Sequence, residues 1–251
     1  MKVSRGQLKK GIYILPSLLT TCSVFCGFYA FIATMNDKFY TAAVAILIAM
    51  VFDGLDGRVA RLTKTSSAFG VQYDSLADVI SFGMAPAFLA YAWVLKPFGH
   101  LGWMAAFLFL LCGALRLARF NVTKPDQMGS NFIGLPIPAA AAVIASIIIA
   151  SEDLFSTRLN PMIMVCIVYL LAFLMVSNLR YPAFKHLEFK KRVPFTRFLF
   201  AVLFLYAFAT VPKVALCVVM GLYLLSGPYL YIQSLFKSHG DNRQHHGANL
   251  P

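Results

Sequence analysis

The stretch from Phe39 to Asp78 reads FYTAAVAILIAMVFDGLDGRVARLTKTSSAFGVQYDSLAD. Residues 39–52 are almost entirely apolar, which is typical of a helix inside a membrane. The polar residues 63–67 interrupt this pattern, and a second apolar segment begins near residue 70. A polar turn between two long apolar segments predicts an antiparallel pair of membrane helices.

Four aspartates lie in this helix pair, although the whole chain has only ten acidic residues. Ionised carboxylates are costly near a bilayer and are kept mainly for function. Asp53 and Asp56 are three residues apart, and Asp74 and Asp78 are four apart, so each pair lies on one helix face. Because the two helices are antiparallel neighbours, we expect the two carboxylate faces to converge.

The composition of the chain places it in the membrane. Of its 251 residues 59% are hydrophobic and 13% are charged, whereas about 25% are charged in soluble domains. Stretches of about 20 apolar residues suffice to cross the hydrocarbon core. The sequence therefore predicts an all-α integral membrane protein, a polytopic bundle of about eight transmembrane helices. The predicted spans are residues 12–35, 39–61, 70–95, 99–119, 135–151, 161–179, 195–211 and 213–236.

The distribution of Lys and Arg predicts the orientation. Basic residues concentrate before the first span, after the second, fourth and sixth spans, and in the tail; the exceptions are Lys38, Lys96, Arg158 and Lys213. The positive-inside bias thus puts both termini and the aspartates on the cytoplasmic side of a cell or inner membrane. The net charge of +12 follows from this anchoring and from anionic membrane lipids, without any nucleic acid.

The chain divides into three predicted parts: a basic N-terminal segment (1–11), a transmembrane catalytic domain (12–236) and a polar tail (237–251). The tail is rich in Gly, Asn and His, and this composition predicts disorder.

The aspartate stretch also predicts a chemistry. Four carboxylates in one pocket stay ionised only if cations are present, and clustered oxygen ligands favour Mg²⁺ or Mn²⁺. Two such ions about 3.5–4 Å apart suit in-line displacement at phosphorus. Small residues at Gly57, Ala60 and Gly70 leave room for a ligand, Arg61 offers a forked cation for phosphate, and Ser67 offers a hydroxyl. The pattern indicates metal-assisted transfer of a phosphate-containing group near lipid.

The frame D-x2-D-G-x2-A-R-x8-G-x3-D-x3-D, from Asp53 to Asp78, resembles the signature of the CDP-alcohol phosphatidyltransferase family at every position. The resemblance implies a six-helix core, here about residues 12–185, with two extra helices within 195–236, in a homodimer. It implies transfer of a phosphatidyl group from a CDP-lipid to a small alcohol, with release of CMP.

The same resemblance implies roles for single residues. Asp53, Asp56 and Asp74 would hold two divalent ions, and Asp78 would reach a metal and act as the general base on the acceptor hydroxyl. Gly57, Arg61 and Ser67 match positions that contact the CDP part. With Ala60, Gly70 and Thr20, they form the predicted site for CDP-diacylglycerol. Thr20 ends the segment LPSLLT (15–20), which resembles the entry motif of the phosphatidylserine synthase branch.

Two further segments, LRLARFN (115–121) and FIGLPIPAA (132–140), also resemble that branch, which implies L-serine as the acceptor. Arg116, Arg119 and Asn121 are then the candidates for binding serine, with the two arginines facing its carboxylate. Basic residues at a helix end also follow from the orientation bias alone, so either arginine by itself is explained without a ligand.

Alternative functions remain open from the sequence. Within the enzyme class, the rival acceptors are glycerol 3-phosphate and inositol or its phosphate. Intramembrane aspartates also occur in transporters of divalent cations or protons, and a silent membrane scaffold is a third possibility. A transporter would need ionisable groups through the depth of the bundle, whereas here they gather at one face.

Overall fold

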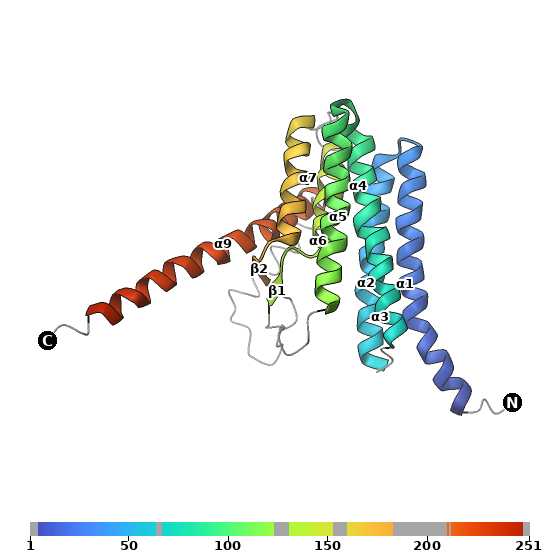
Figure 1. Ribbon diagram of the computed structural model, residues 1–251. Helices are drawn as coiled ribbons and strands as arrows, with labels where there is room; N and C mark the ends of the chain where they lie inside the picture. Colours follow the sequence, from blue (N-terminus) through green and yellow to red (C-terminus); the bar gives the residue numbers. More distant parts are fainter. Residues whose placement is uncertain are drawn as a thin grey trace.

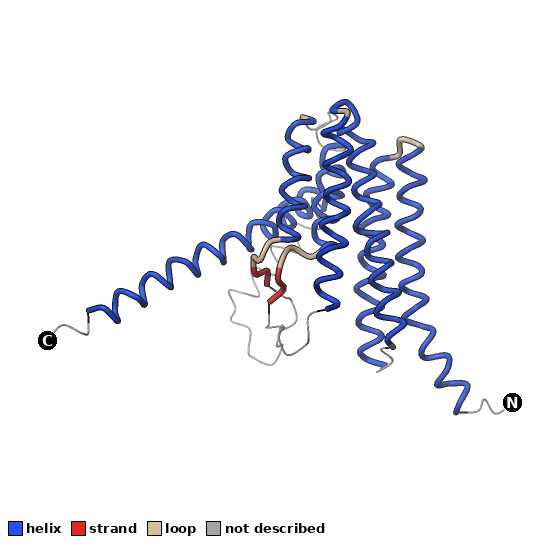
Figure 2. Tube along the Cα trace, viewed as in Figure 1, coloured by secondary structure: helices blue, strands red, loops and turns tan. Residues whose placement is uncertain are grey.

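The computed structural model describes residues 5–63, 67–122, 131–152, 160–182, 210 and 212–247. The fold is all-α, as predicted (Figures 1 and 2). Its elements are α1 (Arg5–Met35), α2 (Phe39–Thr63), α3 (Ala68–Asp78), η1 (Val79–Met84), α4 (Ala85–Ala90), η2 (Tyr91–Leu95), η3 (Lys96–Phe98), α5 (His100–Val122), β1 (Asn131–Ile133), α6 (Ile137–Ala150), α7 (Pro161–Val176), β2 (Arg180–Pro182) and α9 (Pro212–Gly247).

Several of these elements have the length and composition of membrane spans. Among the described residues, five helical segments qualify: Leu15–Met35, Phe39–Thr63, Ala68–Phe98, His100–Val122 and Val214–Tyr231. α6 and α7 are shorter apolar helices. The predicted span 195–211 lies outside the described residues except for Thr210. The protein is therefore a multi-helix membrane protein.

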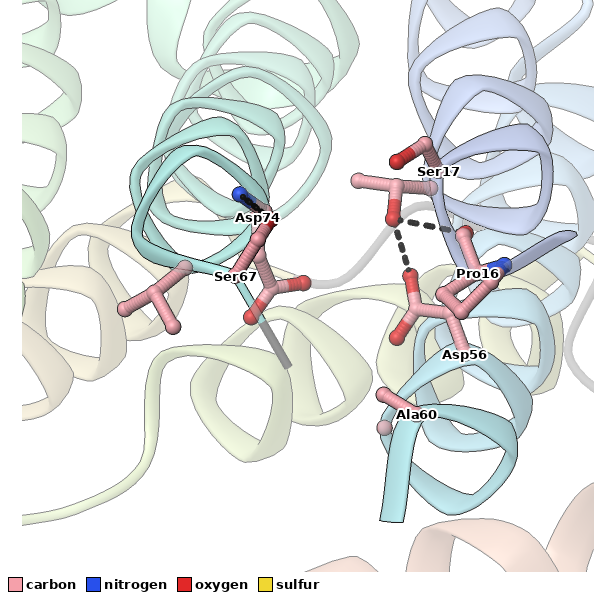
Figure 3. Close-up of a pocket in the computed structure, with 10 residues that line it drawn as sticks. Pro16, Ser17, Asp56, Ala60, Ser67 and Asp74 are labelled. Carbon is pink, nitrogen blue, oxygen red and sulfur yellow. Dashed lines mark hydrogen bonds between the residues drawn. The ribbon is translucent and has the colours of Figure 1, made fainter. Parts of the chain in front are cut away.

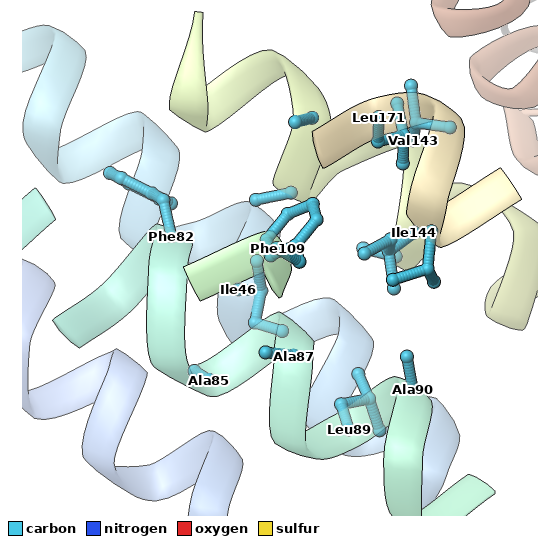
Figure 4. Close-up of a cluster of buried hydrophobic side chains, with 14 of the residues drawn as sticks. Ile46, Phe82, Ala85, Ala87, Leu89, Ala90, Phe109, Val143, Ile144 and Leu171 are labelled. Carbon is cyan, nitrogen blue, oxygen red and sulfur yellow. The ribbon is translucent and has the colours of Figure 1, made fainter. Parts of the chain in front are cut away.

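The short helix α6 lies at the centre of the bundle. Ten of its 14 residues are buried, and it packs against α2, whose buried residues include Ala42, Ala43, Ala45 and Ala49. Small residues let helix backbones approach closely inside a membrane. At 14 residues α6 is only about 21 Å long, and it tolerates this because protein rather than lipid surrounds it. Figure 4 shows Val143 and Ile144 of α6 and Leu171 of α7 in this core.

The third span is not one regular α-helix. Two π-helical turns, η1 and η2, flank α4, and η1 begins directly after Asp78. Here α1 comes very close, because a Cβ on Gly27 would lie 2.8 Å from the Cα of Ser81. The buried Ser81 hydroxyl donates to the Ser23 carbonyl at 3.0 Å. π-turns recur at functional sites, and this one fixes α1 beside the end of the aspartate helix.

Gly134 joins β1 to α6 through a conformation that suits glycine. Its φ is +76°, and a Cβ there would lie 2.3 Å from the Met175 carbonyl oxygen. The Gly134 amide donates to the Leu179 carbonyl at 2.8 Å, which fastens the link to the segment between α7 and β2. Nearby, β1 pairs antiparallel with β2 in a ladder of three residues each.

The C-terminal tail corrects one prediction. Disorder is expected from residue 238 on, but α9 continues as a helix to Gly247. Extending an existing helix is much easier than nucleating one, and no proline lies between Lys237 and Gly247 to stop it. Residues 248–251 lie outside the described part of the chain. The predicted boundaries of the three parts stay predictions.

Candidate active site

The four aspartates meet at one end of the bundle, where α2 ends and α3 begins (Figure 1). One carboxylate oxygen from each of Asp53, Asp56 and Asp74 lies within 4.8 Å of the other two. Asp78, one turn further along α3, is hydrogen-bonded through its side chain to Asp53. The two helix faces therefore converge as the spacing predicts.

This cluster has the donor set of a site for a hard cation. Among the described residues, the contacts of Asp53, Asp56 and Asp74 are with the aspartates themselves, with the Thr20 hydroxyl and with the Gly57 amide, none of which brings a positive charge. Grouped carboxylate oxygens are the ligands that small divalent ions prefer. The cluster can therefore hold a divalent metal, whose charge would offset the repulsion among the carboxylates.

Thr20 of α1 positions one of these carboxylates. Its hydroxyl donates to Oδ2 of Asp56 at 2.7 Å, and it also lies 3.1 Å from the Pro16 carbonyl oxygen of the preceding turn. Both side chains are buried, with Thr20 5% and Asp56 4% exposed. A buried hydrogen bond to a carboxylate is stronger than one between neutral groups. Thr20 thus holds Asp56 in place as well as facing the cavity.

A cavity of about 180 Å³ opens beside the aspartates between α1, α2 and α3. Figure 3 shows Asp56 of α2 and Asp74 of α3 reaching into it from opposite walls. The residues that line it are Pro16, Ser17, Thr20, Asp56, Gly57, Ala60, Ser67, Gly70, Val71 and Asp74. The cavity thus brings together five of the six residues predicted to contact the CDP-lipid.

The sixth, Arg61, lies outside that lining, exposed at the last turn of α2. Conversely, Pro16, Ser17 and Val71 line the cavity without having been assigned to it. Ser17 is three residues before Thr20 on the same face of α1, so helical spacing from Thr20 would have found it.

Ser67 and Gly70 form the cap of α3 at the cavity wall. The Gly70 amide donates to the Ser67 hydroxyl oxygen at 2.9 Å, which satisfies one of the open amides at this helix start. A Cβ on Gly70 would lie only 3.2 Å from that oxygen. The start of a helix favours anions such as phosphate, and here it faces the same space as the carboxylates.

The predicted acceptor residues separate into two kinds. Arg116 is 9% exposed, its Nε has no hydrogen-bond partner among the described residues, and its charge interacts with Asp78. Arg119 is exposed and donates to the Val176 carbonyl at 3.4 Å. Asn121 donates to the Ser75 hydroxyl at 2.9 Å. Of the three, Arg116 lies toward Asp78, while the other two tie α5 to α7 and α3.

The family profile described as CDP-alcohol phosphatidyltransferase matches residues 13–176. The chain belongs to the CDP-alcohol phosphatidyltransferase family. The matched residues include the whole aspartate frame and end with α7, so α9 lies beyond them. The family predicted from the frame is thereby confirmed.

Individual relatives agree with this assignment. A Helicobacter pylori protein named CDP-diacylglycerol--serine O-phosphatidyltransferase is 40% identical over 217 residues, 86% of this chain and 90% of that protein. A protein of the same name from Methanocaldococcus jannaschii is 37% identical over 189 residues, 75% of this chain and 83% of that protein. An archaetidylserine synthase from Methanothermobacter thermautotrophicus is 38% identical over 170 residues, 67% of this chain and 69% of that protein.

Proposed function

We propose that this phosphatidyltransferase moves the phosphatidyl group of CDP-diacylglycerol to L-serine and releases phosphatidylserine and CMP. The proposal rests on the closeness of the cavity, Asp78 and Arg116 to one another. A cavity walled by Asp56 and Asp74 lies beside Asp78, and a buried Arg116 interacts with that same Asp78. The relatives named for transfer to serine cover most of the chain, which favours serine over glycerol 3-phosphate and inositol.

In this proposal Asp53, Asp56 and Asp74 hold two divalent ions, Mg²⁺ or Mn²⁺, and Asp78 reaches one of them. When bound, the ions withdraw negative charge from the phosphate oxygens and from the departing CMP. The 4.8 Å grouping of the three oxygens supports this ligand set. Thr20 keeps Asp56 turned toward the others through its 2.7 Å hydrogen bond.

The CDP part of the donor occupies the cavity. Gly57, Ala60 and Gly70 leave the space open, and Ser67 and Thr20 present hydroxyl groups to it. Arg61 stands at the rim, and its long side chain meets phosphate oxygens from there. The acyl chains stay in the bilayer and enter sideways between helices.

The chemical step begins at the serine hydroxyl. Asp78 accepts its proton, and the serine oxygen forms a bond to the lipid-side phosphorus. The bond from that phosphorus to the CMP oxygen breaks, and CMP leaves with the electron pair. The serine carboxylate meets Arg116, with Arg119 and Asn121 nearer the rim, so that the hydroxyl is held toward Asp78.

The site works at the cytoplasmic face in this proposal, with both termini on the same side and a homodimer as the working unit. The ends of α2 and α5 and the start of α3 share one end of the bundle (Figure 1). This arrangement supports the predicted topology, because the basic residues of those segments then lie together.

An acceptor assay tests the proposal. Purified protein with Mn²⁺ or Mg²⁺ and CDP-diacylglycerol receives labelled L-serine, glycerol 3-phosphate or inositol in separate reactions. We expect CMP and a labelled lipid with serine and background with the other two. CMP release with glycerol 3-phosphate but not with serine would overturn the serine assignment. Metal flux into liposomes without CMP release would favour a transporter instead.

A further inference from the structure

The helix α9 docks on the active-site end of the bundle through Tyr181. This tyrosine of β2 is fully buried, and its ring centre lies 5.7 Å from that of Tyr223 in α9. Burial, with Tyr223 as a smaller contribution, raises the pKa of Tyr181 to about 12. Its hydroxyl therefore stays protonated and donates to the Leu224 carbonyl at 3.4 Å. This contact fixes the level at which α9 crosses the bundle.

A glycine makes this docking possible. A Cβ on Gly227 would lie 2.3 Å from the Cζ atom of Tyr181, so any larger residue would push the helix away from the ring. Gly227 is four residues after Tyr223, which puts both on one face of α9. Beyond this point α9 runs away from the bundle (Figure 1). The Gly227 contact therefore holds the half-buried Tyr223 against the bundle.

Arg116 interacts with both Asp78 and Tyr223. Its charge acts on both groups, although they come from α3 and α9. Arg116 is a buried residue, and its Nε has no hydrogen-bond partner among the described residues. A buried charged donor without a partner is unfavourable. An anionic ligand bound at this point would supply the missing acceptor.

We infer that Tyr223 is a specificity-determining residue of the acceptor subsite, where it and Arg116 together bind the carboxylate of the amino-acid acceptor. This inference rests on the proposed function and extends it to a helix outside the matched family core. Arg116 supplies the forked charged donor that fits a carboxylate. The Tyr223 hydroxyl adds a neutral donor to the same carboxylate, and Asp78 stays available for the acceptor hydroxyl.

Steady-state kinetics of Tyr223→Phe test the inference. The substitution removes one hydroxyl and keeps the ring that contacts Tyr181. We expect the KM for L-serine to rise about tenfold, as for loss of a hydrogen bond to a charged group, with the KM for CDP-diacylglycerol unchanged. The ratio of kcat/KM for L-serine to kcat/KM for ethanolamine, which lacks the carboxylate, should fall by the same factor. The control is Tyr229→Phe on the exposed part of α9, which should change neither constant.

A glycine pair gives a second test that leaves every polar group in place. Gly227→Ala introduces a methyl group against the Tyr181 ring, whereas a Cβ on Gly221 of the same helix meets no atom within 4 Å. We expect Gly227→Ala to raise the KM for L-serine and Gly221→Ala to leave it unchanged. Thermal unfolding of each variant shows whether a loss of activity is due to misfolding.

The outcomes separate this inference from the proposed function. If the unaltered protein releases no CMP with serine, the proposed function fails before any variant is compared. If it uses serine but Tyr223→Phe leaves the KM for serine unchanged, only the role of Tyr223 is overturned. A rise in the KM for CDP-diacylglycerol alone would also overturn it, because α9 would then line the donor site.

Discussion

The aspartate side of the site (Thr20, Asp53, Asp56 and Asp74) and the acceptor side (Arg116, Tyr181 and Tyr223) are built differently. The aspartate side comes mainly from two helices joined by a short turn, so the spacing of residues along the chain largely decides its geometry. The acceptor side is assembled from α5, β2 and α9, which are far apart in the sequence. Signature motifs therefore capture the first side, while the second depends on long-range packing.

The two sides meet at Asp78, which contacts Asp53 and interacts with Arg116. This division predicts that changes on the aspartate side alter metal use and turnover, and that changes on the acceptor side alter the KM for serine. Changes at well-separated positions should combine additively.

Among the changes predicted here, removal of divalent ions should lower the activity most. Treatment with a chelator should lower CMP release by more than about a thousandfold, because metal ions contribute several kcal/mol of charge stabilisation at phosphorus. Activity should return on titration with Mn²⁺ or Mg²⁺ but not with Na⁺. Full activity in the chelator would contradict the role given to the aspartate cluster.

Asp78→Asn should have the second largest effect on activity. We expect kcat to fall about a hundred- to a thousandfold, the usual contribution of a general base. CMP release under saturating serine measures it. Asp37→Asn is the matched control, since Asp37 is an exposed aspartate in the turn between α1 and α2. If Asp78→Asn left kcat unchanged, the assignment of the base would be falsified.

Thr20→Val should weaken metal binding while leaving the acceptor side intact. Loss of the hydrogen bond to Asp56 should raise the Mn²⁺ concentration for half-saturation about tenfold, as is usual for groups that orient a metal ligand. Calorimetric titration with Mn²⁺ measures this without turnover. The neighbouring Thr21→Val is the control, because the Thr21 hydroxyl contacts Tyr73 and the Ser17 carbonyl at the exposed surface. If Thr20→Val changed the KM for serine instead, the aspartate side and the acceptor side would not act separately.

Gly134→Ala should lower stability rather than change the chemistry directly. The positive φ of Gly134 and its closeness to the Met175 carbonyl should make the variant roughly 1–3 kcal/mol less stable. Thermal unfolding in detergent measures the shift. Gly54→Ala serves for comparison, because a Cβ on Gly54 meets no atom within 4 Å and Ala favours the helix. Equal melting temperatures for the two variants would show that the link before α6 is not strained.

Among the substitutions predicted here, Asn121→Ala should have the smallest effect on the enzyme. Its hydrogen bond to Ser75 lies at the exposed surface, and such a bond contributes about 0.5–1.5 kcal/mol at most. The KM for serine should change by less than about threefold, and adding Ser75→Ala should cost nothing further. A much larger rise in that KM would indicate that Asn121 touches the acceptor itself.

The sequence predicts the aspartate side well because its information is local. Helical spacing alone places Asp53 with Asp56 and Asp74 with Asp78, and the polar turn between them makes the pairs face each other. The entry segment that ends at Thr20 is predicted from a resemblance, and the hydrogen bond from Thr20 to Asp56 then follows from close packing of α1. The all-α membrane fold follows from the apolar runs.

Other features have no local signal. The π-turn after Asp78 packs closely against Gly27, and nothing near Asp78 in the sequence reveals this contact. The two prolines that follow Gly134 do not reveal its positive φ. In the tail, continuation of the helix outweighs the polar composition that predicts disorder. Tyr223 is one of several aromatic residues in an apolar helix, and its contact with Tyr181 and its interaction with Arg116 are visible only in the folded protein.

The most direct test of the account follows the serine oxygen. The protein is supplied with CDP-diacylglycerol and L-serine whose hydroxyl carries oxygen-18, and the products are weighed by mass spectrometry. The account predicts that all of the label appears in phosphatidylserine and that CMP is unlabelled, because the serine oxygen attacks the lipid-side phosphorus. Label in a serine–CMP ester, with release of phosphatidic acid, would contradict it.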